Sequence, residues 1–256
     1  MNPCLPAAFL KAPIAHRALH DVVQGRPENS RAAIRAAIAA GYGIEIDLQL
    51  TADNQAMVFH DYSLKRLTGE GGVIRQRSGA QARAIPLTGG DGEAIPTLSE
   101  VLDLIAGQVP LLIEFKDQDG AMGTNIGPLE RAAAEVLRGY RGDVAVMSFN
   151  PNSVALMGEL LPDVARGIVT SAYVYDEWPL SRAVCDHLRD IPDFDRVGAS
   201  FISHEVEDLA APRVAELRSQ GVPILCWTVT SAAQEVEARK VAHNVTFEGY
   251  TSALTP

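Results

Sequence analysis

The clearest alternation of apolar and polar side chains in the chain lies in residues 43–50, Gly-Ile-Glu-Ile-Asp-Leu-Gln-Leu. Successive side chains of a strand point to opposite faces, so Glu45, Asp47 and Gln49 share one face and the apolar residues share the other. Ionised carboxylates are costly to bury unless they are paired or bind a metal ion. The pattern therefore predicts a strand that brings two acidic groups to a polar site.

Short apolar runs recur along the chain and are separated by segments of helical periodicity. Strands are expected to begin near residues 13, 43, 111, 144, 165, 197, 223 and 244. Helices are expected over 31–40, 97–106, 128–140, 152–161, 180–188, 205–220 and 232–241. Eight alternating β and α units in about 250 residues are typical of a closed (β/α)8 TIM barrel. No linker divides residues 1–256, so we expect a single domain.

Residues 62–96 show neither the strand nor the helix period, and they contain two pairs of adjacent glycines. Long irregular segments of compact domains usually carry function. We interpret this stretch as a long loop or a small insertion after the second strand and the apolar segment that ends at His60.

The composition of the chain argues against several classes of binding partner and cofactor. It has 22 Lys and Arg against 32 Asp and Glu, a net charge of −10, and so has no general attraction for nucleic acid or an anionic membrane. Cys4, Cys185 and Cys226 lie far apart and resemble neither a zinc motif nor a disulfide framework. No apolar run approaches the roughly 20 residues of a membrane helix, and residues 1–11 do not look like a signal peptide. We expect a cytoplasmic protein without stable membrane association, and the sequence does not assign an oligomeric state.

Polar residues gather where the predicted strands end, which is where TIM barrels place their active sites. The residues expected at this mouth are His16, Arg17, Glu45, Asp47, His60, Glu114, Lys116, Phe149 and Trp227. The three carboxylates supply hard oxygen ligands, which suit Mg²⁺ or Ca²⁺ better than Zn²⁺. Arg17 and Lys116 suit an oxyanion such as phosphate, and the two histidines can exchange protons near neutral pH. These groups together have the chemistry that phosphoester cleavage needs.

Each of these features also has a plainer interpretation when taken alone. A His-Arg pair is usually a loop feature, two carboxylates on a strand often face solvent, and Glu114 with Lys116 can be a same-face ion pair. Phe149 and Trp227 fit core packing as well as they fit a wall of an alcohol pocket. Asp61 is expected to orient the His60 region rather than to bind metal, and His20 and Asp21 either support the site from the first βα loop or form a plain polar loop. For His187, His204 and His243 we favour structural or surface roles.

The chain resembles the glycerophosphodiester phosphodiesterases through an ordered series of motifs: His16-Arg17, Glu28-Asn29, Glu45-x-Asp47, His60-Asp61 and Glu114-x-Lys116. These enzymes are metal-dependent TIM barrels of the phospholipase-C-like phosphodiesterase superfamily, and the resemblance covers nearly the whole chain. It implies one divalent cation on Glu45, Asp47 and Glu114. It also implies His16 and His60 as the acid/base pair, Arg17 and Lys116 as phosphate contacts, and a small insertion within residues 62–96.

One position departs from the family pattern, because Ala18 stands where Gly usually follows the His-Arg pair. If the backbone there needs φ > 0, Ala costs on the order of 1 kcal/mol relative to Gly. If the position needs only a small residue, Ala is acceptable.

The convergence of residues and the resemblance predict hydrolysis of a small glycerophosphodiester to sn-glycerol 3-phosphate and an alcohol by two-histidine general acid/base catalysis. Which histidine is the base stays open, as does attack by the neighbouring glycerol hydroxyl to give a cyclic phosphate. Two alternatives are a lysophospholipase D acting on lysophospholipids and a catalytically inactive barrel that binds phosphodiesters. The head-group preference depends on residues 62–96 and the loops, which carry no readable code.

Overall fold

The computed structural model describes residues 3–90 and 92–254, and these form a closed parallel barrel. Among them, nine strands share one sheet in the order β1-β9-β8-β7-β6-β5-β4-β2-β3, and β1 also pairs with β2, which closes the ring. β3 (Ala56–Val58) pairs antiparallel with the end of β2 and leaves eight strands for the barrel. Those strands are β1 (Ile14–Ala15), β2 (Gly43–Leu50), β4 (Leu111–Phe115), β5 (Val144–Ser148), β6 (Ala165–Thr170), β7 (Phe201–Glu205), β8 (Ile224–Val229) and β9 (Asn244–Phe247). The predicted (β/α)8 TIM barrel is confirmed.

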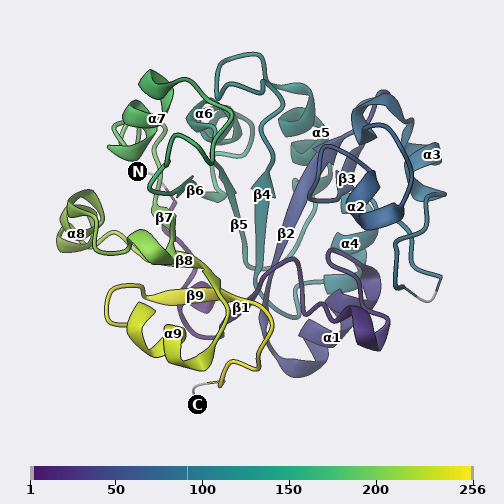
Figure 1. Ribbon diagram of the computed structural model, residues 1–256, viewed down its shortest axis with the longest axis horizontal. Coiled ribbons are helices and arrows are strands. Elements are labelled where there is room, and N and C mark those ends of the chain that lie inside the picture. The colour runs from purple at the N-terminus through teal and green to yellow at the C-terminus, as the bar shows by residue number, and fades with distance from the viewer. Residues whose placement is uncertain (1–2, 91, 255–256) are drawn as a thin grey trace.

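Helices surround the strands (Figure 1). They are α1 (Arg31–Ala40), α4 (Leu98–Ile105), α5 (Pro128–Leu137), α6 (Pro151–Leu160), α7 (Arg182–Arg189), α8 (Pro212–Ser219) and α9 (Ala232–Ala238). Ser30 and Thr97 cap α1 and α4 through their side-chain oxygens. Proline begins α5, α6 and α8, where its missing N–H has no intrahelical partner to lose. No helix of the described part of the chain is both long enough and apolar enough to cross a bilayer.

The lumen of the barrel is a packed apolar core rather than a channel. Inward-facing residues of six strands fill it, among them Leu112, Met147, Phe201 and Leu225. Phe9, from the short 3-10 helix η1 (Ala7–Leu10), packs into the same cluster and is fully buried. Asn244 fastens this segment, because its Nδ2 donates to the carbonyls of Phe9 and Ala12, both at 2.7 Å. The charged side chains of the barrel mouth lie at the opposite, carboxyl end of the strands.

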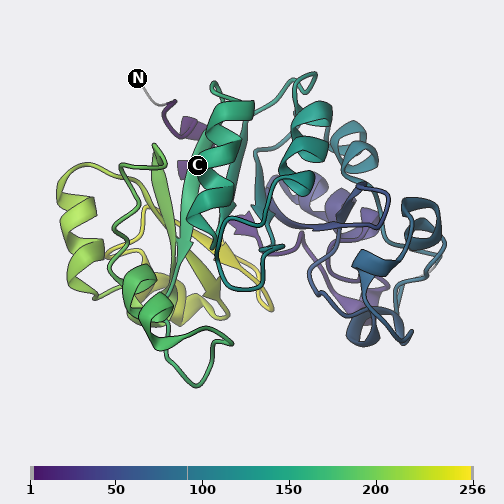
Figure 2. The same ribbon diagram turned by 90° about the horizontal axis from the view of Figure 1, so that it is seen from above.

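The described residues of the segment 62–96, that is 62–90 and 92–96, form a compact unit beside the barrel. They contain α2 (Lys65–Thr68), the 3-10 helix η3 (Ile74–Gln76) and α3 (Gly79–Arg83). Together with two residues of the β3 region they bury a small apolar cluster: Met57, Phe59, Leu64, Ile74, Ala82, Ile85, Leu87 and Ile95. Seen from above, this unit lies on the side of the molecule opposite α7 and α8 (Figure 2). The segment therefore has its own packing that fixes the place of α2.

Several element boundaries differ from the predictions. The strand expected over 197–202 is β7 (Phe201–Glu205), because Gly198 has φ +60° and cannot lie in a strand, while Val197 packs in the outer core. The helix expected over 205–220 is split into the 3-10 helix η4 (Val206–Asp208) and α8. Ala211 has ψ 137°, since a residue before proline avoids the helical region. The helices expected over 128–140 and 232–241 also end three residues early.

Candidate active site

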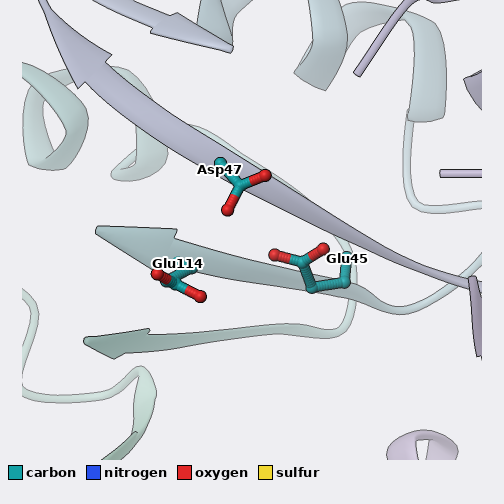
Figure 3. Close-up of side chains that lie close together, drawn as sticks. All are labelled: Glu45, Asp47 and Glu114. Atoms are coloured by element: carbon teal, nitrogen blue, oxygen red, sulfur yellow. The ribbon is translucent and has the colours of Figure 1, made fainter. Parts of the chain in front are cut away.

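Three carboxylates from two neighbouring strands meet at the mouth of the barrel (Figure 3). β2 and β4 run parallel with Asp47 opposite Glu114, and Glu45 lies two residues earlier on the same face of β2. One carboxylate oxygen from each residue lies within 4.8 Å of the other two. The three residues are buried, with exposed fractions of 1%, 1% and 7% for Glu45, Asp47 and Glu114. Adjacent parallel strands thus produce a compact, buried acidic triad.

The triad is electrostatically strained at Glu45. Burial, followed by repulsion from Asp47 and Glu114, raises the pKa of Glu45 well above its ordinary value. Its Oε2 accepts a hydrogen bond from the backbone N–H of Arg17 at 2.8 Å, but its buried Oε1 has no hydrogen-bond partner. A buried oxygen without a donor beside two other carboxylates is a favourable position for a cation.

Two basic side chains contact the rim of the triad. Lys116 Nζ lies 2.8 Å from Asp47 Oδ1 and 2.6 Å from Glu114 Oε1. Arg17 Nη1 donates to Glu28 Oε1 at 2.9 Å, and its Nε lies 3.8 Å from Asp47 Oδ2. Burial alone would raise the pKa of Asp47, but Lys116 and the other nearby cations hold it well below its ordinary value. Asp47 is therefore ionised across the neutral range.

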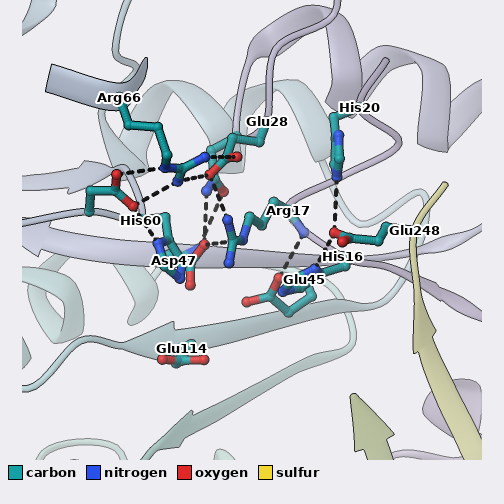
Figure 4. A network of polar contacts seen from close by, with 12 residues as sticks. His16, Arg17, His20, Glu28, Glu45, Asp47, His60, Arg66, Glu114 and Glu248 are labelled. Atoms are coloured by element: carbon teal, nitrogen blue, oxygen red, sulfur yellow. Dashed lines mark hydrogen bonds and ion pairs between the residues drawn. The ribbon is translucent and has the colours of Figure 1, made fainter. Parts of the chain in front are cut away.

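Two imidazoles are each held by a carboxylate (Figure 4). His16 Nδ1 lies 2.7 Å from Glu248 Oε2, and His60 Nδ1 lies 2.7 Å from Asp61 Oδ1. Because an ionised carboxylate only accepts hydrogen bonds, each Nδ1 must carry the proton, which leaves Nε2 free to accept one. Burial and then Lys116 lower the pKa of His60 to about 4, and burial lowers the pKa of His16. Both imidazoles are neutral near pH 7.

A cavity of about 100 Å³ joins these groups. One wall is charged, and the other is formed by Met147, Phe149, Trp227, Thr228 and Thr246. The rings of Phe149 and Trp227 meet edge to face with centroids 5.5 Å apart. The Trp227 Nε1–H donates to the carbonyl of Ser203 at 3.0 Å, which fixes the orientation of the indole. The cavity therefore has one wall suited to ionic chemistry and one suited to apolar contact.

The structure brings every residue predicted for the site to this mouth. Eight of them line the cavity: His16, Arg17, Glu45, His60, Glu114, Lys116, Phe149 and Trp227. The ninth, Asp47, lies in the triad. The catalytic, metal-binding and phosphate-binding roles of these residues stay predictions. Three of the other histidines have partners elsewhere, since His204 contacts Thr170, His243 accepts from the N–H of Ile224, and His187 pairs with Asp193. The fourth, His20, belongs to the site, because its Nε2 lies 3.3 Å from Glu248 Oε2, the oxygen that also contacts His16.

Sequence reasoning missed Glu248 and Arg66, and it gave Glu28 and Asn29 no role. Glu248 directly follows β9, so the rule that strand ends carry site residues could have found it. Asn29 Nδ2 donates to Asp47 Oδ2 at 2.9 Å. Arg66 lies in the irregular segment 62–96, where no sequence pattern pointed to it.

Ala18 adopts the conformation that glycine usually supplies. Its φ is +64°, that of Arg17 is +52°, and its N–H donates to the carbonyl of Glu45 at 2.9 Å. The side chain is also 1% exposed and belongs to the outer core. The first of the two alternatives considered for this position therefore holds, because the backbone at Ala18 is left-handed, and the burial of the side chain favours a small residue as well.

The fold and the mouth define a (β/α)8 barrel with a buried acidic triad and two carboxylate-bound imidazoles. Residues 16–245 match the Glycerophosphoryl diester phosphodiesterase family, and the chain belongs to it. The predicted family is confirmed, and with it the class of enzyme, a phosphoric diester hydrolase.

Individual relatives agree with this assignment. The chain is 29% identical over 177 residues to a glycerophosphodiester phosphodiesterase of Caldanaerobacter subterraneus, covering 66% of this chain and 70% of that protein. A phosphodiesterase structure from Oleispira antarctica, in complex with the product sn-glycerol-3-phosphate, superimposes with a TM-score of 0.75 at 24% identity and covers 94% of each chain. A glycerophosphodiester phosphodiesterase from Thermotoga maritima gives 0.69 at 20% identity, covering 92% of this chain and 94% of that one. At 24% and 20% sequence identity, these two structural similarities show a shared fold and nothing further.

Proposed function

We propose that this protein hydrolyses glycerophosphodiesters to sn-glycerol 3-phosphate and an alcohol, with one divalent cation, Mg²⁺ or Ca²⁺. The observation that carries the proposal is the acidic triad with its unpartnered Glu45 Oε1, set beside two neutral imidazoles in one cavity. The product named for the Oleispira antarctica enzyme supports the same reaction in this family member.

Glu45, Asp47 and Glu114 would hold the cation. All three donors are hard carboxylate oxygens close enough together for one ion, which favours Mg²⁺ or Ca²⁺ over softer metals. When bound, such a cation offsets the charge that develops on the phosphate oxygens. It would also relieve the repulsion that raises the pKa of Glu45.

Arg17 and Lys116 would bind the remaining phosphate oxygens. Both line the cavity and both are already held in place, Arg17 by Glu28 and Lys116 by the triad. A guanidinium matches two phosphate oxygens at once, whereas an ammonium acts as a point charge. Together they orient the diester for attack at phosphorus.

His16 and His60 would carry the protons. Each presents a neutral Nε2, so one can accept the proton of the attacking hydroxyl while the other, once protonated, donates to the leaving alkoxide. Glu248 and Asp61 stabilise the imidazolium that forms on each ring and hold its tautomer. The apolar wall of Phe149 and Trp227 would contact the glycerol or alcohol carbons.

The first experiment measures release of glycerol 3-phosphate from glycerophosphocholine, with EDTA and after addition of Mg²⁺ or Ca²⁺. We expect loss of turnover in EDTA, recovery with one of the two ions, and no turnover in Glu45→Gln. Glu237→Gln is a suitable control, because Glu237 pairs with Lys240 on the surface. Full turnover in EDTA would sink the metal-dependent mechanism, and binding without turnover would favour the inactive barrel.

A separate test shows which histidine is the general acid and which is the general base. The histidine that protonates the leaving group is needed less when that group is p-nitrophenol, which leaves as a stable anion. Comparing His16→Ala and His60→Ala on choline and p-nitrophenyl diesters therefore separates acid from base. Trapping a cyclic phosphate would show that the glycerol hydroxyl attacks first.

A second substrate, a lysophospholipid, is favoured by one feature. The aromatic wall continues outward through Trp178, whose ring centroid is 5.0 Å from that of Phe149 and 4.8 Å from that of Tyr173. A partly buried aromatic run from the cavity toward the surface can hold an acyl chain. Faster turnover of lysophosphatidylcholine than of glycerophosphocholine, lost in Trp178→Ala, would favour this substrate.

A further inference from the structure

One arginine of the segment 62–96 contacts two carboxylates of the site at once (Figure 4). Arg66 Nε and Nη2 donate to Asp61 Oδ2 and Oδ1 at 2.8 and 2.7 Å. Its Nη1 and Nη2 donate to Glu28 Oε2 and Oε1 at 2.7 and 2.9 Å. All four oxygens of the two carboxylates are therefore bound by one guanidinium.

The two carboxylates bind different residues of the proposed active site. Asp61 Oδ1 contacts His60 Nδ1, and Glu28 Oε1 accepts from Arg17 Nη1. In each carboxylate, the oxygen that holds the site residue is also bound by Arg66 Nη2. Arg66 thus links a proton carrier to a phosphate contact through one chain of charge-assisted hydrogen bonds.

The place of Arg66 is set by packing outside the barrel. Leu64, directly before α2, is fully buried in the apolar cluster of residues 62–96, and Leu67 packs against the same cluster. These neighbours fix the backbone from which the Arg66 side chain reaches the mouth. Only arginine offers a rigid fork of donors that can satisfy two carboxylates bidentately, which a lysine ammonium cannot do.

We propose that Arg66 is a positioning residue of the active site, which holds Asp61 on His60 and Glu28 on Arg17. The small unit of residues 62–96 thereby sets the geometry of both the proton carrier and the phosphate contact. For its effect on turnover, this inference rests on the proposed function.

The test compares Arg66→Met and Arg66→Lys with a matched control, Arg83→Met. Arg83 lies in the same unit and is exposed to a similar degree, 55% against 50% for Arg66, and its Nη2 donates to Glu100 away from the mouth. We expect Arg66→Met to lower kcat/KM about 10- to 100-fold, the range for residues that orient site ligands. Arg66→Lys should recover only part of this loss, and Arg83→Met should stay within about twofold of the wild type. Equal losses in Arg66→Met and Arg83→Met would overturn the proposal.

A double-mutant cycle separates positioning from a general loss of structure. If Arg66 acts through its two carboxylates, Arg66→Met should have little further effect in a Glu28→Gln/Asp61→Asn background. Additive losses in the cycle would contradict the proposal.

A second readout does not depend on turnover. In ¹⁵N spectra of the imidazoles we expect His60 to carry its proton on Nδ1 in the wild type and in Arg83→Met, and to show a mixture of tautomers in Arg66→Met. If Arg66→Met does not fold, Arg66→Lys provides the same comparison. An unchanged His60 tautomer in the folded variant would overturn the proposal. Absence of glycerophosphodiester turnover in the wild type would instead overturn the proposed function.

Discussion

The two sides of the barrel mouth differ in both chemistry and electrostatic cost. The ends of β1, β2 and β4, which are neighbours in the sheet, carry the charged groups of the cavity, whereas β5 and β8 supply Met147, Phe149 and Trp227. The charged side includes the repulsion at Glu45 and two left-handed residues, Arg17 and Ala18. On the aromatic side, rings pack edge to face and Trp227 donates its indole hydrogen bond. Charge repulsion and backbone strain thus lie together on the side to which the proposed function assigns the chemistry. The aromatic wall has neither, so we expect that substitutions there alter substrate binding without changing the charged groups.

The largest effect should come from Glu45→Gln, on the charged side. Loss of one ligand of the triad should lower turnover by at least about 10³-fold, comparable to removing a main electrostatic stabiliser of a transition state. The same change removes a buried charge that repels Asp47 and Glu114, so the metal-free variant should melt at a higher temperature than the wild type. Thermal unfolding with excess EDTA measures this gain.

The gain also has a defined pH dependence. A carboxyl group whose pKa is higher in the folded state than in the unfolded chain favours folding when protonated and opposes it when ionised. Glu45→Gln should therefore stabilise most at neutral pH and lose its advantage as the pH falls and the wild-type carboxyl becomes protonated. A variant that melts below the wild type at pH 7 would contradict the account of Glu45.

A smaller loss is expected from Glu248→Gln, which keeps the size of the side chain but removes its charge. Turnover should fall about 10- to 100-fold, as for other groups that orient a functional histidine. Burial lowers the pKa of His16 and the hydrogen bond to Glu248 raises it, so losing the carboxylate should lower this pKa further. NMR titration of the imidazole checks the direction, and an upward shift would refute it.

On the aromatic side, Phe149→Ala should act on binding more than on chemistry. The variant loses ring contacts with Trp227 and Trp178 and part of the cavity wall, a loss of the order of 1.4 kcal/mol, which corresponds to about tenfold in KM. The charged groups on the opposite wall are untouched, so kcat should change less than about threefold. Steady-state kinetics on glycerophosphocholine separates the two constants, and a fall in kcat at constant KM would show that the two sides are not independent.

The smallest effect is expected at Ala18. Glycine would relieve about 1 kcal/mol of left-handed strain but would lose a buried methyl group worth about 0.8 kcal/mol. Ala18→Gly should therefore change the free energy of unfolding by less than about 0.5 kcal/mol in urea titrations. Ala18→Val, which is β-branched and larger, should destabilise by about 2 kcal/mol or more. A strongly stabilised glycine variant would mean that the methyl group contributes nothing.

Local patterns explain why so much of the barrel was predictable. The two-residue period of a strand assigns Glu45 and Asp47 to one face, and most of the strand starts followed from the same apolar runs. Two of the displaced boundaries, at β7 and α8, lie where a glycine with positive φ and a proline override an otherwise continuous pattern. In both places the apolar residues are buried as expected, but outside the element predicted for them.

The sequence by itself determined nine of the residues at the mouth, because strands and their ends are local properties of the chain. Only the tertiary structure decided their partners. Closure of the barrel places β9 beside β1, so Glu248 meets His16 across 232 positions of sequence. The packing of residues 62–96 brings Arg66 to Glu28, 38 positions away. Hydrogen bonds and charges act over a few ångströms in space, and periodicity along the chain carries no information about such distances.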